Sequence, residues 1–174
     1  MTFLDLAKKR ESCRSYDSTR EVEREKLSAI LEAARLSPSA CNSQPYHLYV
    51  VTGEKRGTVA KACMGMGMNP FMKDAPVLLV ITEREYNKTA AFGAKIKHND
   101  YRSIDIGLLA AHITFAAADL GLGSCMLGWF DDAAVREVCR LDKPVRLVIT
   151  LGYPLDAHRE KKRKELDKLV SEVE

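Results

Sequence analysis

Apolar and polar positions follow one another along the 174-residue chain in patterns that predict both helices and strands. The most regular pattern is that of an amphipathic helix, with apolar side chains at i, i+3, i+4 and i+7 and charges on the other face. Its apolar positions are Leu27, Ile30, Leu31 and Ala34. This helix should end near Leu36, because Pro38 disfavours helical geometry at the preceding residue and cannot donate a backbone hydrogen bond.

Mostly apolar segments rich in β-branched residues predict the strands. The clearest is APVLLVIT, because it is apolar throughout and therefore suits a strand buried on both faces. Strands are expected at residues 47–52, 75–82, 124–130 and 144–153. The polar stretch at residues 83–100 predicts a connection or a short helix.

Further helices are expected at residues 2–10, 54–64, 103–123 and 131–140. The segment 103–123 is the most apolar of them, but it contains Asp105, His112 and Asp119, which would be costly to place in a bilayer. We therefore expect a helix buried in the core or in a subunit interface, and no membrane association. Strands interspersed with helices, without internal repeats, predict one α+β domain, residues 1–174, built around a central sheet.

Composition and charge narrow the functional classes. The hydrophobic fraction of 46% and the charged fraction of 29% are typical of a soluble globular protein. The formal net charge is +3, which is too small to predict nucleic-acid binding. Five scattered cysteines without a C-x-x-C pair argue against a disulfide framework and a zinc site. The charged N-terminus lacks the pattern of a signal peptide, so we expect a cytoplasmic protein.

Two clusters of cations could bind an anion. Alternate residues of an extended segment share a side, so Arg10, Ser12 and Arg14 could converge on one ligand. Lys161 and Arg163, near the other end of the chain, could do the same. The simpler interpretation of either charge run is a solvated surface.

The segment between the second helix and the first strand has more hydrogen-bonding side chains than a connection needs. Pro38, Ser39 and Asn42 supply turn residues. Together with Gln44, the polar residues here can donate and accept hydrogen bonds, as the edge of a flat heterocycle requires. Turn formation alone would also explain them.

Other chemistries have weaker support. The glycine-containing segment 120–129 matches neither G-x-G-x-x-G nor a Walker A sequence, although its glycines could let the backbone approach a bound ring closely. The histidines form no metal-binding pattern, and no metal site is expected. Cys41 has no base fixed beside it, so a small, partly buried thiol is its simpler interpretation.

Taken together, four motifs resemble the nitroreductase family of flavoproteins, which bind FMN at a dimer interface. In order along the chain they are RESCRSYD, LEAARLSPSACNSQPYHLYVV, AADLGLGSCMLG and LGYP…KKRKEL. The resemblance implies a small member of the family, with a mixed, mainly antiparallel sheet flanked by helices and an intertwined homodimer. It also implies that the C-terminal tail, about residues 155–174, packs on the partner subunit.

The resemblance gives the candidate residues a shared ligand. Arg10, Ser12 and Arg14 would hold the phosphate, ribityl chain and pyrimidine edge of FMN, and Lys161 and Arg163 would complete the phosphate contacts. The turn would reach the flavin of the partner subunit through Pro38, Ser39, Asn42 and Gln44. The residues against the ring would be Met126, Leu127 and Gly128. Arg14 is the candidate for stabilising the reduced flavin, and Asn69 is a further candidate contact.

The implied activity is transfer of a hydride from NADH or NADPH through flavin N5 to a nitroaromatic, a quinone or a similar small acceptor. Larger members have more chain in the region that corresponds to residues 83–103, where helices cover the substrate pocket. Two alternatives stay open: an FMN-binding redox sensor or flavin carrier without turnover, and a thiol switch that pairs Cys41 with Cys13 or Cys125.

Overall fold

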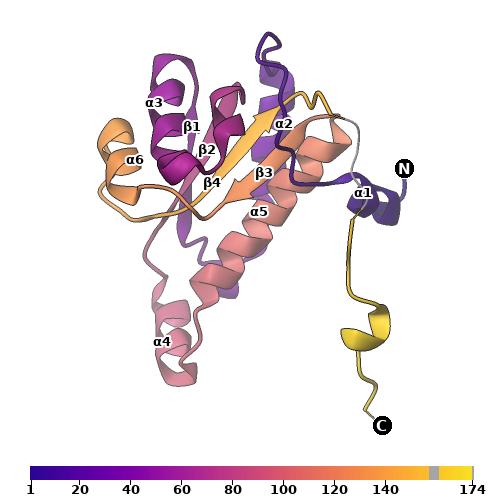
Figure 1. Cartoon of the computed structure of the whole chain (residues 1–174). Helices are drawn as coiled ribbons and strands as arrows, with labels where there is room; N and C mark the ends of the chain where they lie inside the picture. Colours follow the sequence, from indigo (N-terminus) through magenta and orange to yellow (C-terminus); the bar gives the residue numbers. More distant parts are fainter. Residues whose placement is uncertain (157–160, 174) are drawn as a thin grey trace.

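A four-stranded antiparallel sheet forms the centre of the fold (Figure 1). The computed structural model describes residues 1–156 and 161–173. The strand order is β1-β2-β4-β3, and the strands are β1 (Tyr46–Val51), β2 (Val77–Glu83), β3 (Gly123–Leu127) and β4 (Val145–Gly152). The predicted strands and the mainly antiparallel sheet are confirmed. A parallel component is present as an isolated bridge between Ser12 and Ser124, beside β3.

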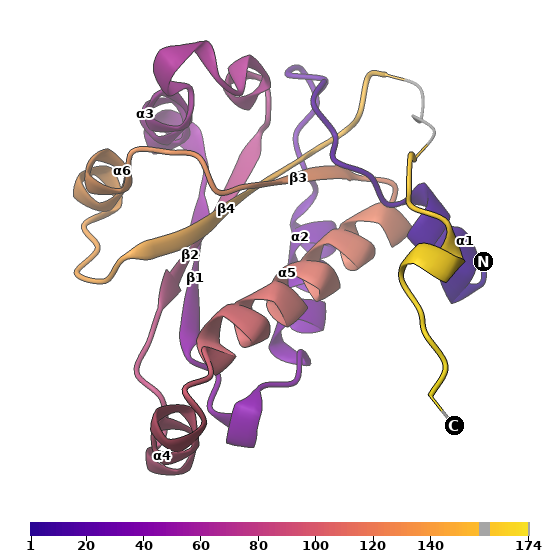
Figure 2. The ribbon, with the colours of Figure 1, turned by 60° about the horizontal axis from the view of Figure 1, so that its bottom comes forward.

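Helices cover both faces of this sheet, with α2 and α5 on one face and α3 and α6 on the other (Figure 2). The helices of the described residues are α1 (Phe3–Lys9), α2 (Arg24–Arg35), α3 (Gly53–Cys63), α4 (Lys88–Lys97), α5 (Tyr101–Asp119) and α6 (Asp132–Cys139). The predicted α+β architecture is thus confirmed. The polar stretch 83–100 contains α4.

Burial on both faces explains why β2 is apolar throughout. Val77, Leu79 and Ile81 pack in the core with α2 and α5. Leu78 and Val80 point the other way, into the core with α3 and α6. Successive side chains of a strand face opposite sides, so a strand between two helical layers needs apolar residues at every position.

The long helix α5 runs along the sheet from the α4 end of the molecule to the α1 end (Figure 2). At its C-terminal end, the Phe115 ring packs against Phe3 of α1 with 5.1 Å between ring centroids. At its N-terminal end Asp105 is buried, and the His112 ring nitrogen Nδ1 lies 2.9 Å from the Leu108 carbonyl oxygen. No helix of the described residues is long and apolar enough to cross a bilayer.

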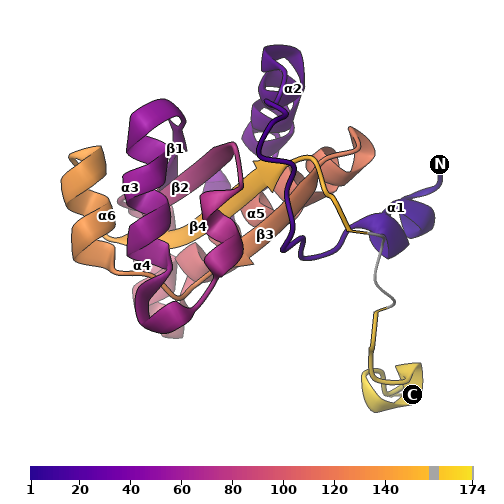
Figure 3. The ribbon, with the colours of Figure 1, turned by 45° about the horizontal axis from the view of Figure 1, so that its top comes forward.

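The C-terminal tail leaves the sheet after β4, passes α1 and extends away from the other helices (Figure 3). Of the expected tail, residues 157–160 and 174 lie outside the described residues. Its apolar side chains are largely exposed on this chain: Leu166, Leu169, Val170 and Val173. Apart from the short 3₁₀ turn Leu166–Lys168 this part of the tail is not helical, so it carries exposed apolar side chains that this chain leaves uncovered.

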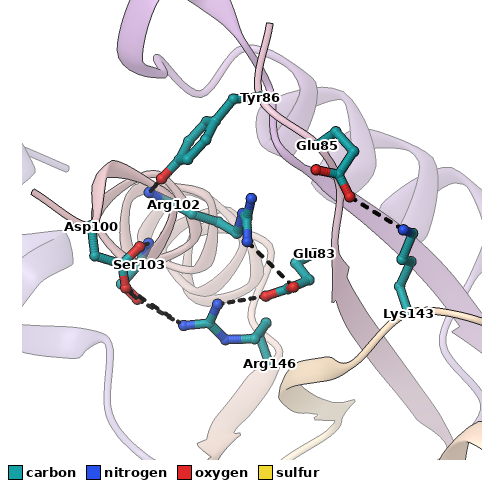
Figure 4. Close-up of polar contacts among 8 residues, drawn as sticks. All are labelled: Glu83, Glu85, Tyr86, Asp100, Arg102, Ser103, Lys143 and Arg146. Carbon is teal, nitrogen blue, oxygen red and sulfur yellow. Dashed lines mark hydrogen bonds and ion pairs between the residues drawn. The ribbon is translucent and has the colours of Figure 1, made fainter. Parts of the chain in front are cut away.

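A paired cluster of charges ties both ends of the segment 84–100 to the sheet (Figure 4). The Glu83 carboxylate lies 3.3 Å from an Arg102 guanidinium nitrogen and 2.7 Å from one of Arg146. Arg146 also donates to the Ser103 hydroxyl at 2.8 Å, and Asp100 lies 3.9 Å away. We call these five residues the Glu83 cluster. They hold the start of α5 against the ends of β2 and β4.

Candidate functional site

A groove lined by cations lies where the end of α1, the segment after it and the C-terminal tail meet. We call it the basic groove, and it is lined by Arg10, Glu11, Ser12, Arg14, Lys161, Lys162 and Arg163. The segment after α1 is fixed to β3, because the Cys13 backbone N–H donates to the Ser124 carbonyl at 2.9 Å. The structure therefore brings together the two cation clusters from opposite ends of the sequence.

The cations of the basic groove crowd one another. Lys161 Nζ donates to the carbonyl oxygens of Ala7 and Lys8, the latter at 2.7 Å, and so caps the C-terminus of α1. Partial burial, followed by the positive charges of Arg10 and Arg163, lowers the pKa of Lys161. Like charges held together raise the free energy of the protonated state, which a bound anion would lower. The groove is therefore suited to an anionic ligand.

Arg14 also lines a second, larger pocket of about 580 Å³. Asn69 and Lys73 line this pocket as well. Asn69 has a left-handed backbone, with φ of 54°, and its Nδ2 donates to the Cys63 carbonyl at 3.2 Å. Sequence reasoning singled out Asn69 but missed Lys73, because one lysine between a Gly/Met loop and a strand has no spacing signal. Arg14 thus lines both the basic groove and a space that could take a larger ligand.

The end of β3 offers one side chain and accessible backbone. Met126 is 42% exposed, whereas Leu127 is 4% exposed and packs in the core with α3 and α6. A Cβ added at Gly128 would meet no atom within 4 Å. Of the three residues predicted to lie against a flavin ring, Leu127 can therefore offer its backbone but not its side chain.

Gly123 serves the fold and not a ligand. A Cβ added there would lie 2.7 Å from the Cys13 side chain, so a larger residue would push the segment 10–14 away from β3. The glycine in this segment thus permits a close approach of protein backbone rather than of a bound ring.

The 38–44 turn has an unusual backbone. Cys41, Asn42 and Gln44 all have positive φ, of 50°, 51° and 47°. Within the turn, the Gln44 N–H donates to Ser39 Oγ at 2.9 Å, and Gln44 Nε2 donates to Asn42 Oδ1 at 3.0 Å. The Asn42 and Gln44 side chains are exposed, as is Pro38, while Ser39 is half-buried. A non-glycine residue with positive φ costs of order 1–3 kcal/mol, so the surroundings must hold this turn in place.

Within one chain, the 38–44 turn and the basic groove lie at opposite ends of α5 (Figure 2). Asp105, near the start of α5, contacts the turn at Ala40. Ala118, near its end, lines a pocket together with Arg10. At 1.5 Å per residue, the helix between these two positions is about 20 Å long. The structure therefore does not bring the predicted turn residues to the predicted phosphate contacts of the same chain.

The cysteines lie in unlike surroundings. Cys41 is exposed on the 38–44 turn, whereas Cys13 and Cys125 are buried, and all are free thiols. Burial is the main cause that raises the pKa of both Cys13 and Cys125. A raised pKa disfavours the thiolate that would attack another sulfur, so the surroundings of these two thiols do not favour a switch with Cys41.

The chain is similar in sequence to known oxidoreductases. The sequence profile of the Nitroreductase family matches residues 7–68 and 64–153. An oxygen-insensitive NADPH nitroreductase from Helicobacter pylori is 28% identical, over 94% of this chain and 96% of its own length. The family match thus covers the groove residues that follow α1, the 38–44 turn and the core as far as the end of β4, but not the groove residues of the tail.

Solved structures have the same fold. An FMN-dependent nitroreductase from Clostridium difficile superimposes with a TM-score of 0.79 and 28% identity, covering 98% of each chain. A nitroreductase family protein from Streptococcus pneumoniae gives a TM-score of 0.83 at 24% identity, over 99% of this chain and 100% of its own. The likeness to the second is one of fold.

Proposed function

The chain belongs to the nitroreductase family, and on that basis we propose that it is an FMN-dependent NAD(P)H oxidoreductase with a small-molecule electron acceptor. The observation that carries the proposal is the basic groove, in which Arg10, Arg14, Lys161 and Arg163 surround Ser12. The named H. pylori and C. difficile relatives support the donor and the cofactor, respectively.

The chemistry of the groove fits the phosphate of FMN. A phosphate monoester carries nearly two negative charges at neutral pH and accepts several hydrogen bonds. The groove offers guanidinium and ammonium donors together with the Ser12 hydroxyl. The pKa of Lys161 is lowered first by partial burial and then by the charges of Arg10 and Arg163, and a bound dianion would offset the repulsion between these charges. Arg10, Lys161 and Arg163 are the proposed phosphate contacts.

Bound FMN would supply the redox chemistry, accepting a hydride at N5 from NADH or NADPH and passing it to a nitroaromatic, a quinone or a similar acceptor. The residues of the protein would bind the flavin, orient it and cover part of its ring. Arg14 holds a positive charge where the groove meets the larger pocket, and we assign it the stabilisation of negative charge on the pyrimidine edge. Met126 and the backbone of Leu127 and Gly128 would lie against the ring.

A second copy of the chain would complete this site. One chain separates the 38–44 turn from its own groove by the length of α5, so Pro38, Ser39, Asn42 and Gln44 can serve a flavin only in another subunit's groove. A homodimer joined along α5 provides that arrangement. The exposed apolar residues Ile104 and Leu108 on α5 suit such an interface, and so do the exposed apolar side chains of the tail.

Purification and turnover test the proposal. We expect a yellow dimer that contains FMN and oxidises NAD(P)H faster when a nitroaromatic or a quinone is added. Colourless protein that takes up no FMN would contradict it. Anaerobic NAD(P)H should bleach the bound flavin, whereas a redox sensor or flavin carrier without turnover would keep it oxidised. Steady-state rates with both nicotinamides and a panel of acceptors would then define the substrates.

A further inference from the structure

Asp105 is an ionisable residue buried within an apolar layer. It is 2% exposed and lies among the core residues of α5, such as Ile106 and Leu109. Its Oδ1 accepts a hydrogen bond from the Ala40 backbone N–H at 3.0 Å, and its Oδ2 has no protein partner among the described residues. A buried carboxylate is costly unless it is compensated. The bond to the Ala40 N–H thus gives this buried acidic side chain a role in holding the 38–44 turn.

Asn87 holds the same turn from a second side. It is the N-cap of α4, and its Oδ1 accepts from the Ala90 N–H at 2.9 Å. Its Nδ2 donates to the Cys41 carbonyl at 2.8 Å, and its backbone N–H donates to Ser43 Oγ at 2.8 Å. One residue thus starts α4 and binds the turn, through different atoms.

These contacts lie at or next to the strained residues of the turn. Asp105 and Asn87 hold Ala40, Cys41 and Ser43, while positive φ occurs at Cys41, Asn42 and Gln44. The held groups are backbone atoms and one hydroxyl, so the Asn42 and Gln44 side chains, which bond each other, stay exposed. The turn is therefore held from the side of α4 and α5, and its solvent-exposed side remains open to a ligand.

The Glu83 cluster and Tyr86 anchor the parts of the chain next to Asn87 and Asp105, and Figure 4 shows Tyr86 and Arg102 in this anchor. The Arg102 guanidinium lies 4.6 Å from the centre of the Tyr86 ring and pairs with Glu83, and the Arg102 N–H donates to the Tyr86 hydroxyl. Tyr86 directly precedes Asn87, and Arg102 lies one helical turn before Asp105. Asn87 and Asp105 thus each follow a residue that is anchored to the sheet.

We propose that Asp105 and Asn87 are positioning residues that hold the 38–44 turn in its ligand-binding shape and so set the flavin affinity of the neighbouring subunit. This inference rests on the proposed function, because it takes the turn to reach the partner's FMN. Neither residue touches the flavin. Each acts through Ala40, Cys41 or Ser43.

The role of each residue can be tested with variants that remove its contact to the turn and keep its other hydrogen bonds. Asn87→Asp keeps the acceptor that caps α4 but loses the Nδ2 donor to Cys41, and we expect FMN affinity to fall about 10-fold. Asp105→Ala should lower FMN affinity about 10- to 100-fold, whereas Asp105→Asn, which can still accept from Ala40, should recover most of it. In hydrogen exchange, the Ala40 amide should lose protection in Asp105→Ala without FMN present.

The matched control is Thr114→Ala. Thr114 is buried on the same helix and bonds the Ala111 carbonyl at 3.2 Å, away from the turn. This variant should lose stability and keep its FMN affinity. If Thr114→Ala and Asp105→Ala weaken FMN binding equally at equal loss of stability, the effect is general destabilisation and the proposal is wrong.

Mixed dimers test the action between subunits. One subunit carries Arg10→Ala and Lys161→Ala, which leaves one intact groove, and Asp105→Ala is placed on either subunit. FMN titration should show weakened binding when Asp105→Ala lies on the subunit without a groove, and unchanged binding when it lies on the subunit with one. An effect on the same subunit, or no effect in either arrangement, would overturn the inference alone. A wild-type dimer that binds no FMN would overturn the proposed function as well.

Discussion

The Glu83 cluster and the basic groove both concentrate arginines at an end of α5, but the arginines have different kinds of partner in the two places. In the Glu83 cluster, Arg102 and Arg146 share one carboxylate within 3.3 Å, and Asp100 stands nearby. In the basic groove, by contrast, Arg14, Lys161 and Arg163 donate hydrogen bonds to backbone carbonyl oxygens. These carbonyl oxygens orient the cations without neutralising them, and the lining of the groove holds the cations Arg10, Arg14, Lys161, Lys162 and Arg163 against the single carboxylate of Glu11, so positive charge is in excess.

The difference separates a structural charge cluster from a binding site. Paired charges at the α4 end hold elements together and leave little field for a ligand. Crowded cations at the α1 end destabilise one another and are stabilised by an added anion. The residue types are the same in both places, and their partners decide the role.

The largest effect should come from removing two groove cations. Arg10→Ala with Lys161→Ala deletes two charge-assisted contacts to phosphate, each of about 1.5–3 kcal/mol, so FMN affinity should fall about 100-fold or more. Flavin fluorescence quenching during titration measures it. The control is Arg35→Ala with Lys143→Ala, which removes the same charge from exposed pairs elsewhere. Equal losses in both variants would mean that only net charge matters.

Glu83→Ala should act on stability instead. It leaves Arg102 and Arg146, whose side chains are 20% and 31% exposed, without their shared carboxylate. We expect a loss of about 1–3 kcal/mol in the free energy of unfolding, measured by urea denaturation, and a much smaller change in FMN affinity than in the groove variant.

Glu85→Ala is the matched control for this cluster. Glu85 pairs with Lys143 at 3.2 Å, but its side chain is 82% exposed (Figure 4). Exposed pairs contribute little, so stability should hardly change. If Glu85→Ala destabilises the protein as much as Glu83→Ala, the partly buried ion pairs of Glu83 have no special role in stabilising the contact between α5 and the sheet.

Salt should sharpen the comparison further. The basic groove is open to solvent, so raising NaCl from about 50 mM to about 500 mM should weaken FMN binding about 3- to 10-fold through screening. The difference in unfolding free energy between wild type and Glu83→Ala should change less, because that pair is partly buried. A salt-independent FMN affinity would argue against a phosphate contact in the groove.

The smallest expected effect is a pH dependence from Lys161. Its pKa lies below the ordinary value of 10.5 in the free protein, and a bound phosphate would raise it. A deprotonated amine cannot bind the anion, so affinity should be constant near neutral pH and fall as pH rises through the lowered pKa, by about 2- to 5-fold. Calorimetry at alkaline pH should also detect proton uptake on binding. Lys161→Ala should abolish both signals.

Local patterns were sufficient to predict most of the fold. The spacing of Leu27, Ile30, Leu31 and Ala34 reports a helix on a core, and the apolar run of β2 reports burial on two faces. The two cation clusters could also be found, because charge and spacing are written in the sequence. Their meeting in one groove is shown by the structure.

Contacts between residues far apart in the sequence could not be predicted from local patterns. Asp105 lies in an apolar helix and holds Ala40, which is 65 positions away, so no short motif connects them. Lys73 is a single cation whose place in the pocket depends on the loop that precedes it. Leu127 belongs to a motif, yet the pleat of β3 turns its side chain into the core. These roles depend on tertiary contacts.

Helix α5 connects the two proposed flavin sites. In the proposed dimer, its first turns carry the support for one flavin and its last turns adjoin the groove for the other, so its length fixes their separation. One added residue would rotate everything beyond it by about 100°, since an α-helix has 3.6 residues per turn. An insertion in the segment 84–100, outside α5, would leave this distance unchanged.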